Sequence, residues 1–274
     1  MLRLFYIKPV RWSPMKPTKR IVGFLSLLAL ASAVPCYSQD PECQVAITVQ
    51  VVLVADGTAE SAAIPSTQTA AYFPTLLAGR SYSVKITTGE VSNADPTIAA
   101  CDLMGNLIPS ADTTGASPQV LSVVGRRLSI TPAVSNTYII RFTNNSTLGD
   151  HVFTGVVEET TLFNPAWSTF GTFETFYSCT NTTTTGTLDA ILKLFDTTGA
   201  EVASFDFTDL PAGGTVSRNT GSTSLNVANG LNGSATLVHN GPPGAFLCEA
   251  AIADFATAPR VIQPVKFEPT RQMR

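Results

Sequence analysis

Short runs of β-branched and aromatic residues, separated by glycine, proline, asparagine and aspartate, repeat along the chain from Gln44 onward. In residues 81–88, Tyr82, Val84 and Ile86 alternate with polar side chains. Because successive side chains of a strand point to opposite sides, this spacing predicts a strand with one buried and one wetted face. Beyond the N-terminal segment, no window has apolar residues at helical spacing. The chain is therefore predicted to be all-β.

The predicted strands fall into two groups, which separate near Glu159, where residues 164–167 (Asn-Pro-Ala-Trp) interrupt the rhythm. A chain of this length makes one large β domain or two of ordinary size, and the interruption favours two. We predict two tandem antiparallel β-sandwiches, jelly-roll-like or immunoglobulin-like, at residues 39–158 and 159–274. The predicted strands are 45–54, 71–77, 81–88, 97–103, 127–131, 137–143 and 152–157, then 173–180, 187–195, 201–207, 215–219, 234–239, 245–254 and 261–267.

Three connections between these strands have a distinctive composition. Residues 108–119 are rich in Pro, Ser, Asp, Thr and Gly and poor in apolar residues, which predicts a surface loop. Residues 196–199 (Asp-Thr-Thr-Gly) and 240–244 (Asn-Gly-Pro-Pro-Gly) are predicted hairpin turns, because glycine supplies a positive φ and proline cannot continue a strand.

Residues 1–38 have the layout of a secretory signal peptide. Several basic residues and no acidic residue precede an apolar run from Ile21 to Val34. That run is shorter than the roughly 20 residues that span a bilayer, so we expect no membrane anchor after cleavage. Met15 begins a more compact leader and is an alternative start. Small residues permit cleavage after Ala33 or after Ser38.

The number of cysteines distinguishes the two cleavage sites. Cleavage after Ser38 removes Cys36 and leaves an even set that suits an oxidising compartment, whereas cleavage after Ala33 leaves an odd thiol. No Cys-x-x-Cys spacing is present, which argues against zinc and redox motifs. The simplest pairing lies within each half, and the alternative is two or four buried free thiols. The predicted disulfides are Cys43–Cys101 and Cys179–Cys248.

Charge argues against a nucleic acid partner. The leader holds six of the 17 basic residues and none of the 20 acidic ones, which leaves 11 basic residues and a net charge of −9 after cleavage. Binding to phosphates needs clustered Lys and Arg. A local basic cluster near the C-terminus consists of Arg260, Lys266, Arg271 and Arg274. We interpret it as a solvated chain end.

The first half carries a family resemblance. Residues 72–84 (Tyr-Phe-Pro-Thr-Leu-Leu-Ala-Gly-Arg-Ser-Tyr-Ser-Val), 95–102 leading to Gly105, and 128–132 running into 136–140 follow one another in an order that resembles bacterial pre-peptidase C-terminal domains. The resemblance covers roughly residues 70–157 and implies a jelly-roll-like sandwich that accompanies secreted enzymes. Cys101-Asp102 stands where the family has an aromatic residue before the Asp, and its closing Gly-x-Tyr strand is absent, which removes the basis for a shared acidic metal site.

The second half resembles β-sandwich repeats of unknown function in secreted bacterial proteins. The resemblance lies in residues 167–169 (Trp-Ser-Thr), 176–178 (Phe-Tyr-Ser), 240–244 and 265–268 (Val-Lys-Phe-Glu). It implies a fold and names no chemistry.

No catalytic or metal-binding constellation stands out in the sequence. The two histidines, His151 and His239, are far apart and neither lies near a Gly-x-Ser-x-Gly elbow, so a Ser-His-Asp triad has little support. The spacing of the acidic residues favours neither a glycosidase pair nor a calcium site. The carboxylates considered are Glu158, Glu159, Glu174 and Glu249 for the pair, and Asp95, Asp102, Asp196 and Asp209 for calcium.

Aromatic residues gather between Trp167 and Tyr177. Burial in a sandwich core is the simpler account of such a cluster, whereas a row of exposed rings would suit stacking on sugars. A sugar-binding surface at this place would use Trp167, Phe170 and Tyr177.

These observations predict an exported, non-catalytic β-sandwich protein without a cofactor, found in the secreted, periplasmic or cell-surface fraction. It is expected to act as a structural or binding module whose partner is a cell-surface protein or a polysaccharide. The alternative is a carbohydrate-binding accessory module of a secreted enzyme system, and a secreted hydrolase is the third hypothesis.

Overall fold

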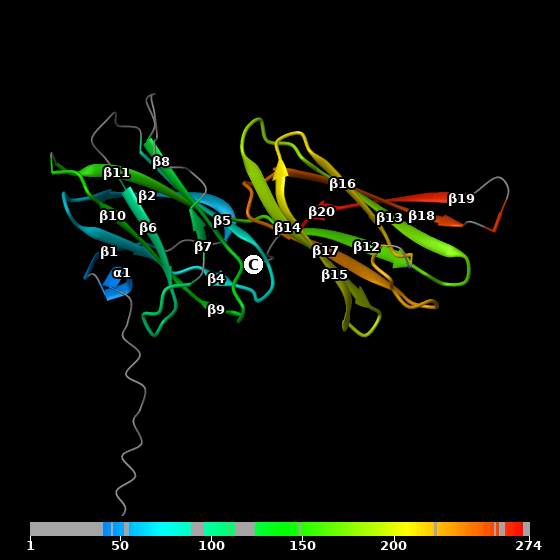
Figure 1. Cartoon of the computed structure of the whole chain (residues 1–274). Helices are drawn as coiled ribbons and strands as arrows, with labels where there is room; N and C mark the ends of the chain where they lie inside the picture. Colours follow the sequence, from blue (N-terminus) through cyan, green and yellow to red (C-terminus); the bar gives the residue numbers. More distant parts are fainter. Residues whose placement is uncertain are drawn as a thin grey trace, which may run out of the picture. The chain divides into compact units, whose positions relative to one another are not determined.

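The computed structural model describes residues 41–44, 46–51, 55–88, 96–108, 110–112, 124–147, 149–221, 224–254, 256–257 and 261–270. Within these residues the predicted all-β class is confirmed, and the strands form mostly antiparallel sheets (Figure 1). One difference is α1 (Pro41–Gln44), a single helical turn that the periodicity does not reveal. The predicted leader, residues 1–38, lies outside the described residues.

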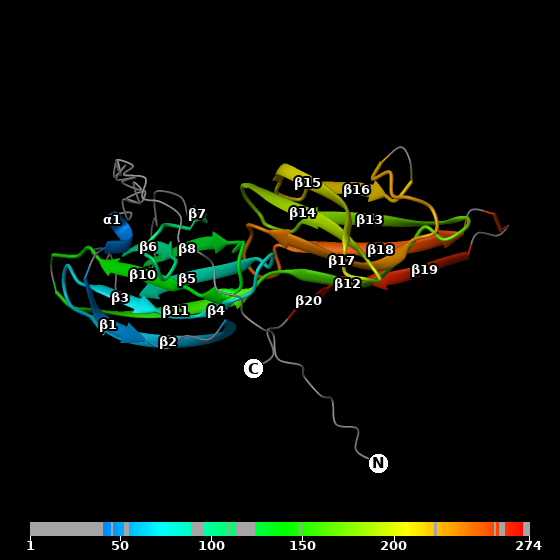
Figure 2. The same cartoon turned by 90° about the horizontal axis from the view of Figure 1, so that it is seen from below.

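The strands up to Glu159 form the N-terminal sandwich. They are β1 (Ile47–Val51), β2 (Asp56–Ile64), β3 (Thr69–Tyr72), β4 (Thr75–Leu76), β5 (Tyr82–Thr88), β6 (Pro96–Cys101), β7 (Ser110–Asp112), β8 (Val124–Ile130), β9 (Asn136–Thr137), β10 (Ile139–Asn144) and β11 (His151–Glu159). One sheet has the order β1-β3-β10-β6 and the other β2-β11-β5-β8-β7, while β4 and β9 pair separately. β3, labelled in Figure 2, lies between β1 and β10 and runs parallel to β1.

The core of the N-terminal sandwich is built from both of its sheets. Tyr82, Val84 and Ile86 are fully buried, as their alternation predicts, but Ser81 and Ser83, on the face predicted to be wetted, are buried as well. Within the core, the Tyr72 ring stacks on Phe142 with ring centroids 5.0 Å apart. A Cβ at Gly155 would lie 2.6 Å from Cζ of Tyr72, so glycine at this position gives the ring its room.

The strands from Leu162 form the C-terminal sandwich. They are β12 (Leu162–Ser168), β13 (Phe173–Asn181), β14 (Thr187–Asp196), β15 (Glu201–Pro211), β16 (Thr215–Asn219), β17 (Asn232–His239), β18 (Phe246–Asp254), β19 (Val261–Lys266) and β20 (Glu268–Pro269). The sheets have the orders β15-β14-β17-β12-β20 and β16-β13-β18-β19. At one edge of the core, the Arg218 guanidinium lies over the Phe205 ring, 3.8 Å from its centroid. The two side chains form a cation–π interaction there.

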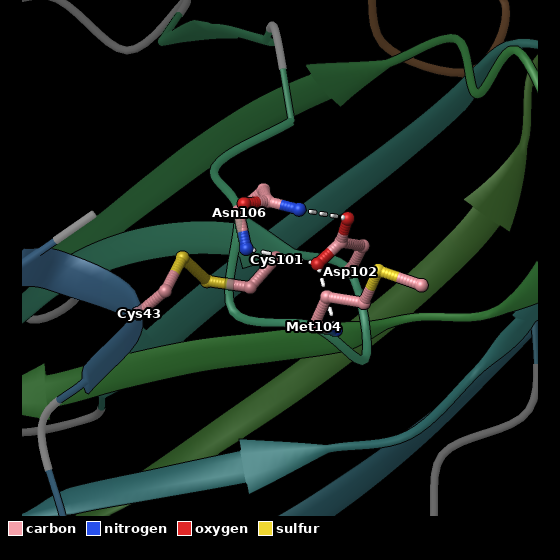
Figure 3. Close-up of a disulfide and its surroundings, with 5 residues drawn as sticks. All are labelled: Cys43, Cys101, Asp102, Met104 and Asn106. Atoms are coloured by element: carbon pink, nitrogen blue, oxygen red, sulfur yellow. Dashed lines mark hydrogen bonds between the residues drawn. A yellow bond between two sulfur atoms is a disulfide. The ribbon is translucent and has the colours of Figure 1, made fainter. Parts of the chain in front are cut away.

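Both predicted disulfides are present, one in each sandwich. Cys43 of α1 is joined to Cys101 at the end of β6, across 58 residues of sequence (Figure 3). Cys179 and Cys248 are direct partners in the register of β13 and β18, and their bridge spans 69 residues. Loops of this length make each bridge worth roughly 4 kcal/mol in the chain-entropy model.

Two of the longer strands, β2 and β12, form where the sequence pattern predicts none. Residues 56–64 are mostly small or polar, yet β2 pairs along β11 from Ile64 opposite His151 to Asp56 opposite Glu158. Pairing with a central strand overrides weak intrinsic propensity. Residues 164–167 are predicted to interrupt the rhythm, but they lie inside β12, where a register shift between Asn164 and Trp167 accommodates Pro165.

The predicted connections are confirmed in part. At residues 196–199 the chain makes a hairpin, in which Asp196 N donates to Ala200 O at 2.9 Å and Gly199 takes a φ of 85°. Residues 240–244 instead carry the chain from β17 in one sheet to β18 in the other, so the hairpin prediction is wrong there. The predicted loop 108–119 contains the short strand β7, and the predicted strand 71–77 divides into β3 and β4.

Candidate functional site

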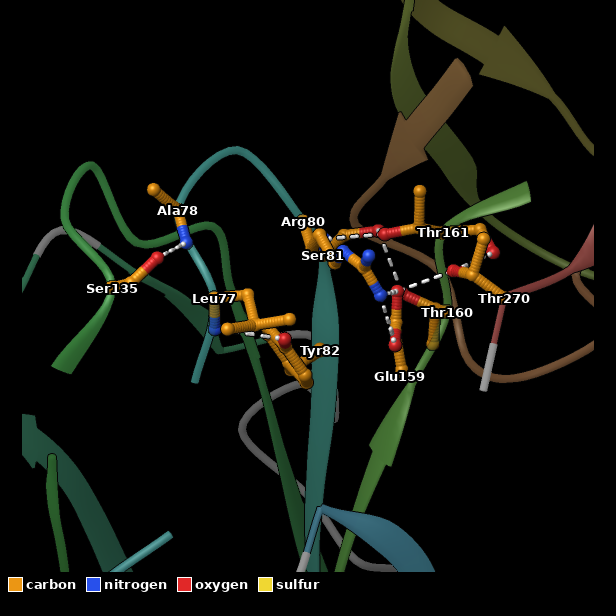
Figure 4. A network of polar contacts seen from close by, with 10 residues as sticks. All are labelled: Leu77, Ala78, Arg80, Ser81, Tyr82, Ser135, Glu159, Thr160, Thr161 and Thr270. Atoms are coloured by element: carbon orange, nitrogen blue, oxygen red, sulfur yellow. Dashed lines mark hydrogen bonds and ion pairs between the residues drawn. The ribbon is translucent and has the colours of Figure 1, made fainter. Parts of the chain in front are cut away.

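Thr160 and Thr161 connect the two sandwiches and are almost fully buried. Three hydrogen bonds tie them to Ser81, just before β5 (Figure 4): Thr160 N to Ser81 O at 2.8 Å, Ser81 N to Thr161 Oγ1 at 2.8 Å, and Thr160 Oγ1 to Ser81 Oγ at 2.9 Å. Thr270, just after β20, donates its N–H to Thr161 O at 3.0 Å. Burial of a linker requires such pairing of its backbone groups. The junction network, as we name it, consists of Arg80, Ser81, Glu159, Thr160, Thr161 and Thr270.

A buried ion pair completes the junction network. Arg80 Nη1 lies 3.1 Å from both carboxylate oxygens of Glu159. The Glu159 side chain is only 2% exposed, whereas that of Arg80 is 36% exposed. The hydroxyl of Thr270 donates a further hydrogen bond to Glu159. A buried carboxylate is tolerated when its oxygens are paired and hydrogen-bonded, as they are here.

His239 lies beside this network at the end of β17 and is 4% exposed. Its Nδ1 accepts a hydrogen bond from Gly241 N at 3.1 Å, and its ring centroid is 5.0 Å from that of Phe246. Burial, and secondarily the charge of Arg127, lowers the pKa of His239 to about 4. The imidazole is therefore neutral near pH 7.

The contact between Ser81 and His239 does not have the geometry of a nucleophile and its base. The main-chain N–H of His239, not its ring, donates to Ser81 Oγ at 3.2 Å. Ser81 is itself fully buried. His151 lies at the start of β11, and its ring packs edge-on against Phe153 with centroids 6.3 Å apart. The two histidines thus have separate environments.

Two of the aspartates considered for calcium hold local backbone structure. Asp102 accepts hydrogen bonds from the N–H groups of Met104 and Asn106, both at 2.8 Å, in the turn after Cys101 (Figure 3). Asp196 does the same for Thr198 and Ala200. Hydrogen bonds to the charged form lower the pKa of both carboxyl groups, although burial opposes this, most at Asp102.

The other two aspartates give no support to a calcium site. Asp209, in β15, donates its main-chain N–H to Asp189 Oδ1 at 2.9 Å, and Asp95 lies outside the described residues. No group of three or more His, Cys, Asp or Glu side chains that could hold a metal ion is found among the residues that the structure describes.

The carboxylates considered for a glycosidase pair are distributed over different places. Glu158 and Glu159 both line a cavity of about 730 Å³ next to the junction network, together with Asp56. Glu159 is already bound to Arg80 and Thr270. Glu174 lines a different pocket. Glu249, in β18, is paired in register with Ser178 on one side and Lys266 on the other.

The aromatic run divides into core and surface. Trp167 and Tyr177 are 1% and 2% exposed, so they belong to the core and cannot offer a stacking surface. The indole Nε1 of Trp167 donates to Phe195 O at 3.0 Å and to Ser234 O at 2.9 Å. Burial raises the pKa of the Tyr177 phenol. Phe170, by contrast, is 65% exposed, and of the three proposed sugar-binding rings it alone faces solvent.

A pocket of about 250 Å³ lies at the turn between β12 and β13. One wall is this turn, including Thr172, Phe173 and Glu174, and the other is the segment after β16, including Gly221 and Asn229. Phe173 is 38% exposed. We call this the β12–β13 pocket, with the lining residues Thr169, Gly171, Thr172, Phe173, Glu174, Thr220, Gly221, Val227 and Asn229.

The sequence pattern reveals neither the junction network nor the β12–β13 pocket. Ser81 and Thr160 are 79 positions apart, and Thr161 and Thr270 are 109 apart, so only the fold brings them together. The one available signal for the pocket is the turn sequence Thr169-Phe170-Gly171-Thr172-Phe173, in which two rings flank a glycine.

The comparisons with known proteins assign no family. No protein-family model matches the chain, and no curated protein matches it either. In the part of the chain that the structure describes, no helix is long and apolar enough to span a membrane.

Proposed function

We propose that the chain is an exported, non-catalytic β-sandwich protein that acts as a structural or binding module. The observation that supports this most directly is that the buried ionisable side chains at the junction are bonded to other groups of the protein. Glu159 is neutralised by Arg80, and His239 is hydrogen-bonded to the backbone with a lowered pKa. Both groups stabilise the connection between the sandwiches, in the place where an enzyme of two domains would keep reactive groups accessible.

The disulfides support the proposed compartment. The chain has two disulfides. Disulfides persist in oxidising compartments and are rare where glutathione keeps thiols reduced. The leader-like residues 1–38 agree with this location, as do the resemblances of both halves to domains of secreted bacterial proteins.

Production of the full-length chain and of a chain without residues 1–38 in a Gram-negative host tests export. We expect the full-length chain in the periplasm, shortened and with both disulfides formed, and the truncated chain in the cytoplasm. Recovery of unprocessed full-length protein from the cytoplasm would contradict export.

The non-catalytic role is tested with the purified mature protein on chromogenic glycosides, esters and peptides. We expect no turnover above that of heat-denatured protein. Turnover that disappears in Glu158→Gln, with the fold retained, would establish a hydrolase instead.

The alternative of a carbohydrate-binding module is favoured by one specific observation. Two phenylalanine rings, Phe170 in the turn and Phe173 at the start of β13, are exposed beside the β12–β13 pocket. Exposed aromatic rings next to polar groups are suited to stacking on sugars.

A further inference from the structure

The β12–β13 pocket is a preformed site rather than a gap between loose segments. Thr169 donates its hydroxyl to the carbonyls of Ala228 and Leu231, at 2.7 and 3.2 Å, which fixes the turn to the opposite wall. Thr175 and Thr220, both almost fully buried, exchange two hydrogen bonds beneath the pocket, at 2.9 and 3.0 Å. Hydrogen bonds of this kind hold both walls in place before a ligand arrives.

A glycine leaves room for one carboxylate in this pocket. A Cβ on Gly221 would lie 3.0 Å from Oε2 of Glu174, which means that the carboxylate lies directly over the backbone at this glycine. Thr172 is oriented separately, because its hydroxyl donates to Asp254 at 2.6 Å. The Oδ1 of Asn229 accepts a hydrogen bond from Gly230 N at 2.8 Å. The Glu174 carboxylate, as an acceptor, and the Asn229 side-chain NH2 group, as a donor, are therefore the groups that we assign to a ligand.

The chemistry of the lining defines the class of ligand. Phe173 offers an apolar face, Glu174 accepts hydrogen bonds, and the side-chain NH2 group of Asn229 donates them. No basic side chain is among the described lining residues, so an anionic ligand would meet the charge of Glu174 without compensation. The volume is below the roughly 300–1,000 Å³ of pockets for drug-sized ligands, which suits one ring at a time.

We propose that the β12–β13 pocket binds a neutral saccharide, with one sugar ring against Phe173, its hydroxyl groups bonded to Glu174 and Asn229, and Phe170 extending the surface toward the next ring. The inference deepens the binding role proposed above and rests on it. It replaces Trp167 and Tyr177, which are buried, with Phe173 and Glu174, which the sequence does not single out as sugar-binding residues.

The test is isothermal titration of the mature protein with neutral gluco-, xylo-, manno- and N-acetylchito-hexaoses, alongside acidic hyaluronan and polygalacturonate oligomers. We expect saturable binding of at least one neutral hexaose and no binding of the acidic oligomers. Phe173→Ala should weaken binding at least about tenfold, as truncation of a central aromatic contact commonly does. Phe170→Ala should weaken it less and only for hexaoses, not for single sugars.

Phe163→Ala is the matched control. Phe163 is 37% exposed, nearly the same as Phe173, but it lies on β12 rather than β13 and does not line the pocket. Affinity should be unchanged in this variant. If Phe173→Ala fails to fold, Glu174→Ala and Glu174→Gln test the pocket in its place. Glu174→Ala should lower the affinity for the hexaose at least about tenfold. Glu174→Gln should lower it less, because an amide still forms hydrogen bonds with hydroxyl groups.

The proposal is overturned if no neutral hexaose binds, if only the acidic oligomers bind, or if Phe163→Ala and Phe173→Ala weaken binding equally. None of these results bears on export or disulfide formation, which are measured separately. Failure of this inference is therefore distinguishable from failure of the proposed function.

Discussion

His239 is the residue whose environment has the clearest consequence in solution. Its pKa is lowered to about 4 in the folded protein by burial, whereas an unfolded chain titrates near 6.5. Between these values the unfolded chain binds the extra proton, so the free energy of unfolding falls as the pH falls. The stabilisation is complete above pH 6.5 and is lost toward pH 4, by about 3 kcal/mol in total. Urea unfolding at pH 7 and pH 4.5 measures it.

The control for this prediction is His239→Asn, which removes the titrating group. The variant should be less stable at pH 7, because Gly241 N loses its partner, but its stability should change less between pH 7 and 4.5 than that of the wild type. An equal slope in both proteins would mean that other groups carry the pH dependence.

Trp167 becomes the only tryptophan once the leader is removed, so its fluorescence reports one site. Since the side chain is 1% exposed, emission should be blue-shifted in the folded protein and protected from acrylamide. Trp167→Ala should lower the free energy of unfolding by about 3–5 kcal/mol, as deletion of a large buried ring does. Red-shifted, readily quenched emission from the folded protein would place this ring at the surface.

Disulfide partners and the burial of Trp167 can be predicted from the sequence, whereas the exposure of Phe170 cannot. The partners of Cys43 and Cys179 follow from cysteine parity and from pairing within halves, because few combinations exist. Burial of Trp167 follows from its size. The exposure of Phe170, so soon after the buried Trp167, does not follow from composition, because it depends on where the turn between β12 and β13 falls.

At the scale of elements, the junction network predicts an asymmetry between its two charged members. Arg80→Met leaves Glu159 buried without its counter-charge and should cost about 3–5 kcal/mol. Glu159→Gln leaves Arg80 at a position where it reaches water, and should cost only about 1–2 kcal/mol. Thermal or urea unfolding of the two variants gives the comparison.

The double variant with both changes provides the control for this asymmetry. It should be more stable than Arg80→Met alone, because the uncompensated buried charge is gone. If Glu159→Gln proves the more damaging single change, the ion pair is not the source of the effect.

Elements with strong alternation are predicted from the sequence, and those set by their neighbours are not. β5 is recognisable because Tyr82, Val84 and Ile86 supply both pattern and propensity. β2 has neither and forms because β11 offers it a partner over nearly its whole length. β12 is not predicted because Pro165 interrupts its sequence pattern. The proline is tolerated because β20 pairs only with Leu162 and Phe163, so Pro165 has no ladder partner in β20.

At the scale of the whole molecule, the proposed export raises the question of where the mature chain begins. Cleavage after Ser38 leaves the four cysteines that form the two disulfides, so the mature protein should contain no free thiol. Cleavage after Ala33 would retain Cys36, a few residues before Cys43. A thiol so near would be able to attack the Cys43–Cys101 bridge and exchange with it.

We therefore expect N-terminal sequencing of the exported protein to begin at Gln39, and thiol titration in denaturant to find no free thiol. Peptide mapping without reduction should link Cys43 to Cys101 and Cys179 to Cys248. A chain that begins at Val34, with one free thiol and a mixture of Cys36 and Cys43 bonded to Cys101, would refute the parity argument for Ser38. Changing Cys36 to Ser separates the two cases, because it alters thiol content and bridge pattern only if Cys36 remains in the mature protein.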